Sequence, residues 1–350
     1  MMTSSQTSGT SPDSGTPVGS DPATGPTTTT STAADADPAS GAGTSPASAP
    51  PAEQVRGIWR FVRQPSLDLV RRWGWASVIA NLVIVGTGGL VRLTDSGLGC
   101  PTWPRCTDAS YTPHAALGIH GAIEFGNRML GFVVAVIAIG TWLVAWRYRP
   151  VRRDLRRLAT AAALGIPAQA VLGGITVRTG LNPWTVSAHF LLSMGIITLT
   201  VSLMRRSRTS PYPHTPPVVR ALAVAAVAAV WTTVLLGTVV TGSGPHAGDT
   251  DAHRTGFDPE VISQVHADAV FALLGISVAL VIATRVTATS RTLRQLATWL
   301  MATELSQAAV GFVQYFTGLP ILAVLLHMLL AATLIALVTA VYGERGTPAT

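Results

Sequence analysis

Eight apolar runs of roughly 20 residues follow one another between residues 73 and 342, separated by shorter polar segments. A helix rises about 1.5 Å per residue, so each run is long enough to cross the roughly 30 Å hydrocarbon core of a bilayer. The expected spans cover residues 73–93, 121–146, 158–177, 185–204, 219–241, 261–284, 295–316 and 320–342. The pattern therefore predicts an all-α polytopic membrane protein with eight transmembrane helices.

The two ends of the chain differ from this apolar region. Roughly the first 55 residues are Ser, Thr, Pro, Ala and Gly with a few aspartates, a composition that cannot bury a core. They contain no apolar segment of the kind found in a cleaved signal peptide. We expect a disordered cytoplasmic tail at 1–72, an N-terminal half at 73–204, a cytoplasmic linker at 205–218, a C-terminal half at 219–342 and a cytoplasmic tail at 343–350.

The positive charge is distributed as topology requires. All 24 basic residues are arginine, the mean hydropathy is +0.41, and charged residues make up 12% of the chain. The arginines gather after the second, fourth and sixth spans, at 147–157, 205–220 and 285–294, and few lie in the other loops. Because arginine-rich loops stay inside the cell, both termini are expected in the cytoplasm and the protein in the cell membrane. The pI near 10.4 therefore needs no nucleic-acid partner.

Each even-numbered span carries a polar residue within about two turns of its outer end. These residues are Asn127, His189, His266 and His327. Polar and ionisable groups are costly in hydrocarbon, so we expect them to face the protein interior, at one matched depth, and to have a function.

The second span begins with a cluster of polar residues. His120, Glu124 and Asn127 follow one another at i, i+4 and i+7, so they share one helix face, and Arg128 is beside them. One interpretation places all four in the headgroup layer, where water solvates them. The other places Glu124 and Arg128 inside the protein, where the carboxylate can relay protons; for His120 both stay open.

The two halves of the apolar region resemble each other. Gln169 precedes His189 by 20 residues, and Gln307 precedes His327 by the same interval. The interval from Asn127 to His189 is 62 residues and that from His266 to His327 is 61. The segment Thr94-Asp-Ser-Gly97 also has an echo in Thr241-Gly-Ser-Gly244. We therefore expect two parallel pseudo-symmetric four-helix bundles, with two equivalent pockets at the same depth.

His266 and His327 lie on separate spans, with no cysteine or carboxylate placed to complete a zinc site. Paired histidines in a membrane bundle suit axial ligation of heme iron; the alternative is that they only hydrogen-bond neighbouring helices. The corresponding pair in the first half is Asn127 and His189. Asparagine is a poor iron ligand, so this pocket would keep an open position for chemistry, with His120 as a substitute ligand further out.

Other residues near the outer side have less specific signals. Arg92 and Arg128 are candidate clamps for heme propionates, although Arg92 is equally well explained as an interfacial anchor. Cys100 and Cys106 lie in the first outer loop, where a disulfide is permitted, either structural or redox-active. Glu304, in the seventh span, lies outside the repeat and has no assigned role. Glycines at 86, 88, 89, 173 and 174 are expected to allow close helix packing.

Several motifs, in order, resemble those of heme A synthases. They are the segment from Gly88 to Cys106, the motif Glu124-Phe-Gly-Asn-Arg128, and the blocks at 169–189 and 307–327. The likeness extends over about residues 73–342, and the arginine-only basic set with alanine-rich spans resembles an actinobacterial member. The sequence departs from the family pattern at Asn127, where many members have a histidine. It also lacks the second cysteine pair that some members carry in the third outer loop.

The resemblance implies an oxidoreductase that makes heme A for cytochrome oxidase. It would convert a ring methyl of heme O to a formyl group by successive hydroxylations, with water as the oxygen source. It also implies heme b on His266 and His327, the substrate heme on His189, and Glu124 as an essential acid. Expected partners are heme O synthase, cytochrome oxidase assembly factors, an unidentified electron acceptor, membrane lipid and a second copy of the chain.

Two other functions explain parts of the sequence. A diheme membrane cytochrome that transfers quinol electrons would need two fully ligated hemes, and Asn127 argues against the second. A transporter built from parallel repeats would explain the internal symmetry but not the histidines at matched depth.

Overall fold

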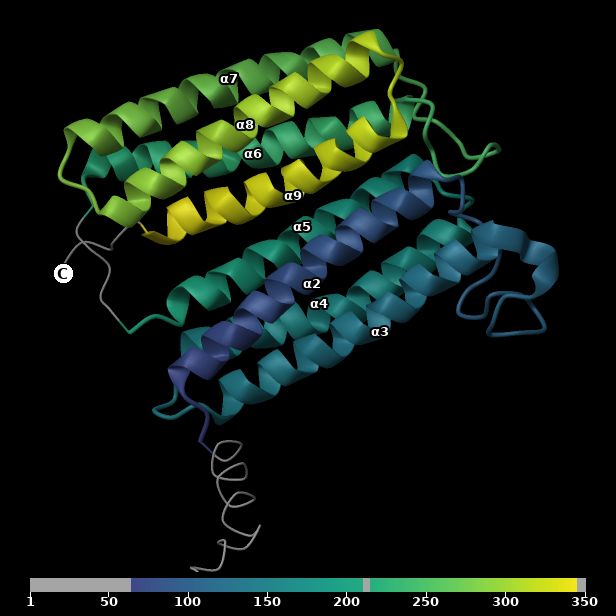
Figure 1. Cartoon of the computed structure of the whole chain (residues 1–350), viewed down its shortest axis with the longest axis horizontal. Coiled ribbons are helices and arrows are strands. Elements are labelled where there is room, and N and C mark those ends of the chain that lie inside the picture. Colours follow the sequence, from purple (N-terminus) through teal and green to yellow (C-terminus); the bar gives the residue numbers. More distant parts are fainter. Residues whose placement is uncertain (1–63, 210–214, 345–350) are drawn as a thin grey trace, which may run out of the picture. The chain divides into compact units, whose positions relative to one another are not determined.

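The computed structural model describes residues 64–209 and 215–344, and within these ranges it is helical, with no β-strand. Eight long helices and one short 3₁₀ turn, η1 (Ala115–Leu117), follow one another (Figure 1). The long helices are α2 (Leu67–Leu93), α3 (Gly118–Arg147), α4 (Arg153–Arg178), α5 (Pro183–Arg206), α6 (Pro217–Ser243), α7 (Pro259–Val286), α8 (Arg291–Phe316) and α9 (Ile321–Glu344). The predicted fold class, all-α, is therefore confirmed for the described residues.

Seven of the long helices are apolar enough to cross a membrane, by length and composition, in the part of the chain that is described. The exception is α8, which the sequence also predicts to be a span. Its polar residues, among them Arg294, Glu304 and Gln307, lower its hydropathy. The span at 295–316 therefore stays a prediction, whereas each of the other seven expected spans lies, to within one residue, in a helix that meets the criterion.

The helix ends follow from local capping chemistry. Ser66 accepts a hydrogen bond from the backbone nitrogen of Leu69, and Asp68 pairs with Arg71, so α2 begins at Leu67. The expected tail at 1–72 is consequently helical over its last six residues. The other tail and linker boundaries shift by two residues or fewer, because α5 ends at Arg206 and α9 at Glu344.

The helices pack as two sets of four. Within the first set, α2 contacts α3 and α5, and α4 also contacts both; within the second, α6 contacts α7 and α9, and α8 also contacts both. Figure 1 shows the two sets side by side, with the loops after α2 and α6 at the same end. The sets meet where α9 packs on α5 and α2 and where α6 packs on α5. In each set, two helices lie on a diagonal, α3 with α5 and α7 with α9.

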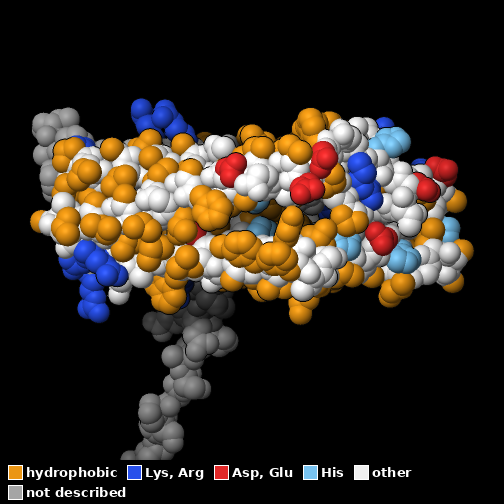
Figure 2. Space-filling view, turned by 90° about the horizontal axis from the view of Figure 1, so that it is seen from above, with side chains coloured by type: hydrophobic (Ala, Val, Ile, Leu, Met, Phe, Trp, Pro, Cys, Tyr) orange, Lys and Arg blue, Asp and Glu red, His pale blue; other side chains and the backbone are white. Residues whose placement is uncertain are grey.

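One apolar core runs through both sets. It includes Val78 on α2, Met194 and Ile197 on α5, Val230 on α6 and Ile335 on α9, all buried. Apolar side chains also cover much of the outer surface of the helices (Figure 2), as expected for a surface that faces lipid rather than water.

The arginine-rich end of the helices contains a buried acid that the sequence pattern does not single out. Glu344, the last residue of α9, has a fully buried side chain and pairs with Arg205 and Arg208. Its backbone oxygen also accepts a hydrogen bond from the Thr215 hydroxyl. This cluster joins the end of α9 to the end of α5, one helix from each set.

Candidate functional site

Four matched positions, on helices α3, α5, α7 and α9, each lie against a glycine of the preceding helix. A Cβ atom built on Gly173 of α4 would lie 3.1 Å from Cε1 of His189, and one built on Gly237 of α6 would lie 3.2 Å from Cε1 of His266. The next pair is Gly311 with His327, at 3.7 Å, and the last is Gly88 with the Asn127 amide, at 3.9 Å. Gly88 and Gly173, which were expected to serve helix packing, therefore also make room for these side chains, and Gly237 and Gly311 do the same in the second half.

The segments Thr94–Gly97 and Thr241–Gly244 are not equivalent in the structure. Thr94 is the C-cap of α2, whereas Thr241 lies inside α6, which continues to Ser243. The two segments therefore lie at the ends of α2 and α6 in different registers, while the pairing of glycines with Asn127 and the three histidines recurs in all four helix pairs.

His266 and His327 lie on α7 and α9, the two diagonal helices of the second set. Their Nδ1 atoms, like that of His189, are buried without a hydrogen-bond partner, although the backbone of Thr233 lies near the His266 ring. A buried polar atom without a partner typically costs about 1–3 kcal/mol. Direct ligation of a metal by the unpaired nitrogen itself is one way to offset that cost.

The donor set fits a metal that brings most of its own ligands. No group of three or more His, Cys, Asp or Glu side chains comes together within the described ranges. A porphyrin supplies four nitrogen ligands to its iron, so two axial histidines complete the coordination. The alternative, that the histidines only hydrogen-bond neighbouring helices, has no support at His327, whose Nδ1 is unpaired, whereas the Thr233 backbone is such a neighbour for His266.

The first set holds Asn127 and His189 on its own diagonal. The Asn127 Oδ1 accepts a 2.7 Å hydrogen bond from the Thr87 hydroxyl on α2, and the side chain is half-buried. Gln169 on α4 donates to the His189 backbone oxygen at 3.1 Å and also to the Ser193 hydroxyl, so it fixes α5 around the histidine.

The second set keeps the glutamine but not its hydroxyl partner. Gln307 occupies the position of Gln169 in the repeat and is buried, with its Oε1 unpaired. The residue that corresponds to Ser193 in the repeat is Ala331, which has no hydrogen-bonding side chain. The surroundings of the two histidines that follow these glutamines have therefore diverged.

Glu124 and Arg128 hold the first outer loop. Glu124 is only 6% exposed, and its Oε2 accepts a 2.6 Å hydrogen bond from the backbone nitrogen of Cys100. Its Oε1 accepts from Arg128, which also donates to the backbone oxygens of Cys100 and Thr102, both at 3.1 Å. Cys100 and Cys106 form the expected disulfide. The interpretation that Glu124 and Arg128 are solvated in the headgroup layer is wrong for Glu124.

His120 and Arg92 lie at the same end of the helices. His120 is exposed, and its Nδ1 is 3.0 Å from the Ser96 hydroxyl. Arg92 donates from NH2 to the backbone oxygen of Thr241 at 3.0 Å and from Nε to that of His246 at 2.5 Å. Arg92 therefore joins the end of α2 to the end of α6 and the loop behind it.

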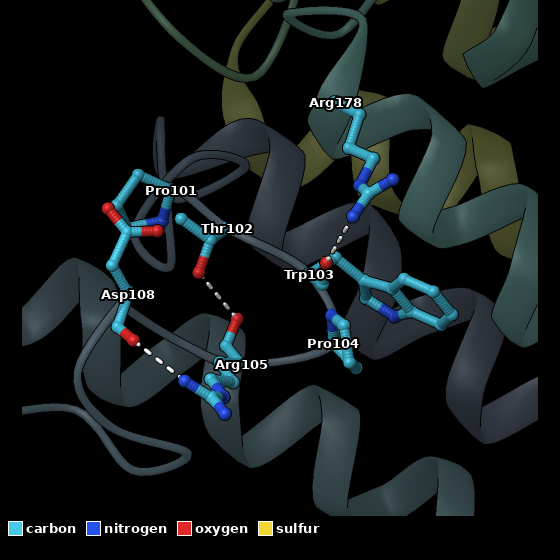
Figure 3. Close-up of a pocket in the computed structure, with 7 residues that line it drawn as sticks. All are labelled: Pro101, Thr102, Trp103, Pro104, Arg105, Asp108 and Arg178. Atoms are coloured by element: carbon cyan, nitrogen blue, oxygen red, sulfur yellow. Dashed lines mark hydrogen bonds between the residues drawn. The ribbon is translucent and has the colours of Figure 1, made fainter.

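A pocket of about 300 Å³ in the disulfide loop was missed by the sequence reasoning. Figure 3 shows its lining, with Arg178 of α4 donating to the backbone oxygen of Trp103 at 3.2 Å. The Trp103 ring lies against Gly174, next to the glycine that contacts His189. The adjacent Gly173-Gly174 pair is the signal that could have indicated a ring on each side of α4.

Glu304, to which the sequence assigns no role, joins two helices of the second set. The side chain is 3% exposed, and its Oε1 accepts a 2.7 Å hydrogen bond from Ser277 of α7. This contact is a buried polar link between α7 and α8.

The COX15-CtaA family, described as cytochrome oxidase assembly protein, matches residues 71–339. The heme A synthase of Listeria welshimeri is 32% identical over 128 residues, which are 35% of this chain and 40% of that protein. The heme A synthase of Geobacillus kaustophilus is 30% identical over 155 residues, 42% of this chain and 46% of that protein. The chain thus aligns with less than half the length of these curated relatives.

Proposed function

Because the chain belongs to the COX15-CtaA family of cytochrome oxidase assembly proteins, we propose that it is a heme A synthase. The reaction would oxidise a ring methyl of heme O to a formyl group by successive hydroxylations, with water as the oxygen source. The heme A synthases similar to this chain support the assignment. The structural observation that carries it is the set of four glycine-opposed positions, three of them histidine.

In this proposal the two sets of helices are pseudo-symmetric bundles with different tasks. The exchange of α2 to α5 with α6 to α9 preserves the pattern of helix contacts, including those between the sets. All eight long helices would cross the cell membrane, with the arginine-rich end and both termini in the cytoplasm. The N-terminal half, 73–204, would take substrate, and the C-terminal half, 219–342, would hold the cofactor.

The C-terminal half would hold heme b between His266 and His327. Three features support this: the two helices lie on a diagonal, the imidazole Nδ1 atoms have no other partner, and Gly237 and Gly311 leave room for the rings. Heme b, when bound, would supply one-electron chemistry that carries electrons from the substrate to an acceptor.

The N-terminal half would bind heme O, with His189 as the iron ligand. Asn127 lies on the opposite diagonal helix and is already bonded to Thr87, so it would leave the other axial side weakly held or open. His120 is the proposed substitute ligand, and Arg92 a proposed partner for a propionate. Arg128, whose guanidinium is engaged by Glu124 and the loop, would act on the pocket by positioning that loop.

Glu124 is the proposed acid–base group for substrate oxidation, which releases protons. Its carboxylate lies one turn from Asn127 on α3, on the side of the disulfide loop. The hydrogen bond from Cys100 and the ion pair with Arg128 also favour a second role, in which Glu124 fixes the loop over the pocket. Replacement by glutamine separates these roles, because the amide can still accept a hydrogen bond but cannot take up a proton.

The experiment that tests the function is heme analysis of the purified protein. Coexpression with a heme O synthase should give heme A among the extracted hemes, and a reduced-minus-oxidised spectrum should show low-spin heme b. Two bound b hemes without any heme A would favour the alternative, a diheme cytochrome that transfers quinol electrons. Cytochrome oxidase assembly factors and an electron acceptor are the further partners of this proposal, and a homo-oligomer is its expected assembly.

A further inference from the structure

A second pocket, of about 430 Å³, lies at the arginine-rich end of the helices, between the end of α3 and the start of α4. It is lined by Trp146, Arg153, Arg156, Arg157, Thr160, Ala161 and Leu164. None of these residues belongs to the candidate functional site at the other end of the helices.

One wall of this pocket is a fixed aromatic surface. The indole nitrogens of Trp142 and Trp146 both donate to the Thr160 hydroxyl, at 3.1 Å and 3.0 Å. The Arg156 guanidinium lies 4.8 Å from the centre of the Trp146 ring and donates to the Trp146 backbone oxygen. Arg156 and Trp146 are thereby held in place, with their positions set by contacts within the protein.

Two further guanidinium groups are free to bind a ligand. Arg153 and Arg157 are exposed and lie four residues apart on one face of α4. Neither pairs with an acidic side chain in the described part of the chain, and the nearest acid in the sequence, Asp154, is already paired with Arg152. The pocket therefore presents uncompensated positive charge beside the Trp146 ring.

The chemistry of the pocket changes along α4. The pocket is lined by Arg153 and Arg157 near the start of α4 and by Ala161 and Leu164 further toward the middle of the helix. The Leu164 side chain is 64% exposed. A cationic region followed within about 10 Å by an apolar one matches an amphipathic anion rather than a small soluble one. Basic pockets between membrane helices bind the headgroups of anionic lipids, and tryptophan is enriched at that depth.

We propose that this pocket is a binding site for an anionic glycerophospholipid. Arg153 and Arg157 bind the phosphate, the Trp146 ring contacts the glycerol region, and Ala161 with Leu164 contacts the first methylene groups of an acyl chain. The site is independent of the heme chemistry, since it lies at the opposite end of α3 and α4 from Asn127 and Gly173.

The second set of helices provides a matched control. By the interval that relates Gln169 to Gln307, Arg153 corresponds to Arg291 and Arg156 to Arg294, both exposed at the start of α8. Thr284 stands where the first set has Trp146, and the exposed ring of Trp299 stands where it has Ala161. Two of the three arginines are thus repeated, with Gln295 in the place of Arg157, without the aromatic wall and with Trp299 in the apolar region.

The test is native mass spectrometry of the full-length protein with phosphatidylglycerol, phosphatidylcholine and glycerol 3-phosphate as probes. The unchanged protein should retain one phosphatidylglycerol in preference to phosphatidylcholine. Arg153→Gln with Arg157→Gln should weaken this retention about 30-fold, because each arginine near an anionic headgroup contributes a factor of about five. Arg291→Gln with Arg294→Gln should leave it unchanged.

Three results would overturn the proposal. They are equal loss of lipid in the two double variants, equal retention of the two lipids, and displacement of phosphatidylglycerol by glycerol 3-phosphate at equal concentration. Ala161→Trp, which copies the α8 residue and keeps every charge, provides an independent measurement. It should lower phosphatidylglycerol retention while the thermal unfolding midpoint without lipid stays unchanged; full retention would remove the acyl contact from the proposal.

Discussion

Gly237 of α6 and His266 of α7 are in such close contact that a Cβ atom on the glycine would lie 3.2 Å from Cε1 of the imidazole. Real Cβ atoms are rarely this close to a neighbour, so the histidine rotamer depends on the absence of a side chain across the helix interface. The same dependence holds for His189 and Gly173. Each of these two histidine positions is therefore specified together with a glycine on the preceding helix.

The first prediction follows from this contact. Gly237→Val should displace the His266 ring and lower the heme b content of the purified protein, since overpacking of this kind costs about 1–3 kcal/mol. The matched control is Gly275→Val on α7, where a Cβ meets no atom within 4 Å. The measurement is the heme b to protein ratio. Equal ratios in the two variants would contradict the proposed dependence of the His266 position on Gly237.

Replacement of the proposed ligands themselves should have a larger effect. His266→Ala or His327→Ala should lower the low-spin heme b signal at least tenfold, because each removes an axial ligand whose supporting shell alone is worth roughly 10–100-fold. His253→Ala, in the loop between α6 and α7, serves as a control of the same residue type. A variant that lacks both His266 and His327 but keeps a normal heme b spectrum would contradict their assignment as heme b ligands.

Glu124 gives a prediction that distinguishes chemistry from loop positioning. Glu124→Ala should keep heme b and accumulate heme O or a hydroxylated intermediate, with a rate loss of about 10²–10⁴-fold. Glu124→Gln should be equally slow if the carboxylate transfers protons, and much closer to normal if it only accepts the hydrogen bond from Cys100. Extracted hemes are quantified by chromatography. Loss of heme b in either variant would make the residue structural for the whole fold.

The disulfide tests the expected orientation. If the loops after α2 and α6 are outside the cell, Cys100 and Cys106 are oxidised there and the chain has no other cysteine. A membrane-impermeant thiol reagent should therefore label intact cells only after a reductant is added. Labelling without reductant, or labelling that requires lysis, would contradict the orientation.

Glu344 gives a prediction for stability. Its side chain is fully buried and pairs with Arg205 and Arg208, so Glu344→Ala should remove the carboxylate that both arginines contact. Breaking a buried ion pair on one side typically costs about 3–5 kcal/mol, which should lower the thermal unfolding midpoint by several degrees. Glu260→Ala, at an exposed position in the first turn of α7, is the control and should change the midpoint little.

The sequence predicts the helices well because their apolar runs are long and their boundaries are marked by proline, serine and arginine. It also predicts that Asn127 and the three histidines occupy matched positions on their helices, because the repeat interval and the helix period can be read directly from the sequence. Arg128 pairs with Glu124 at i, i+4 within α3, so this partner can be read from the sequence. The other partner of Glu124 is the backbone nitrogen of Cys100, in a loop that doubles back onto α3, and a backbone donor leaves no mark in the sequence.

Glu344 shows a second limit of sequence reasoning. It follows an apolar run directly, so it is easily taken for the first residue of a solvated tail. Its burial depends on Arg205 and Arg208, which lie more than a hundred residues earlier and come close only because α9 packs on α5. This contact joins a helix of the first set to a helix of the second, so comparing the two halves of the sequence does not reveal it.

The contact of Arg92 with Thr241 and His246 makes the two halves of the chain non-interchangeable. A perfectly two-fold pair would carry two such contacts or none, but α6 has no arginine in its last turn to reciprocate. A chimaera with two copies of the second half would therefore lose this arginine. One with two copies of the first half would place two guanidinium groups at one junction. The two sets of helices therefore differ at their junction, and reversing their order along the chain would move this arginine to the other set.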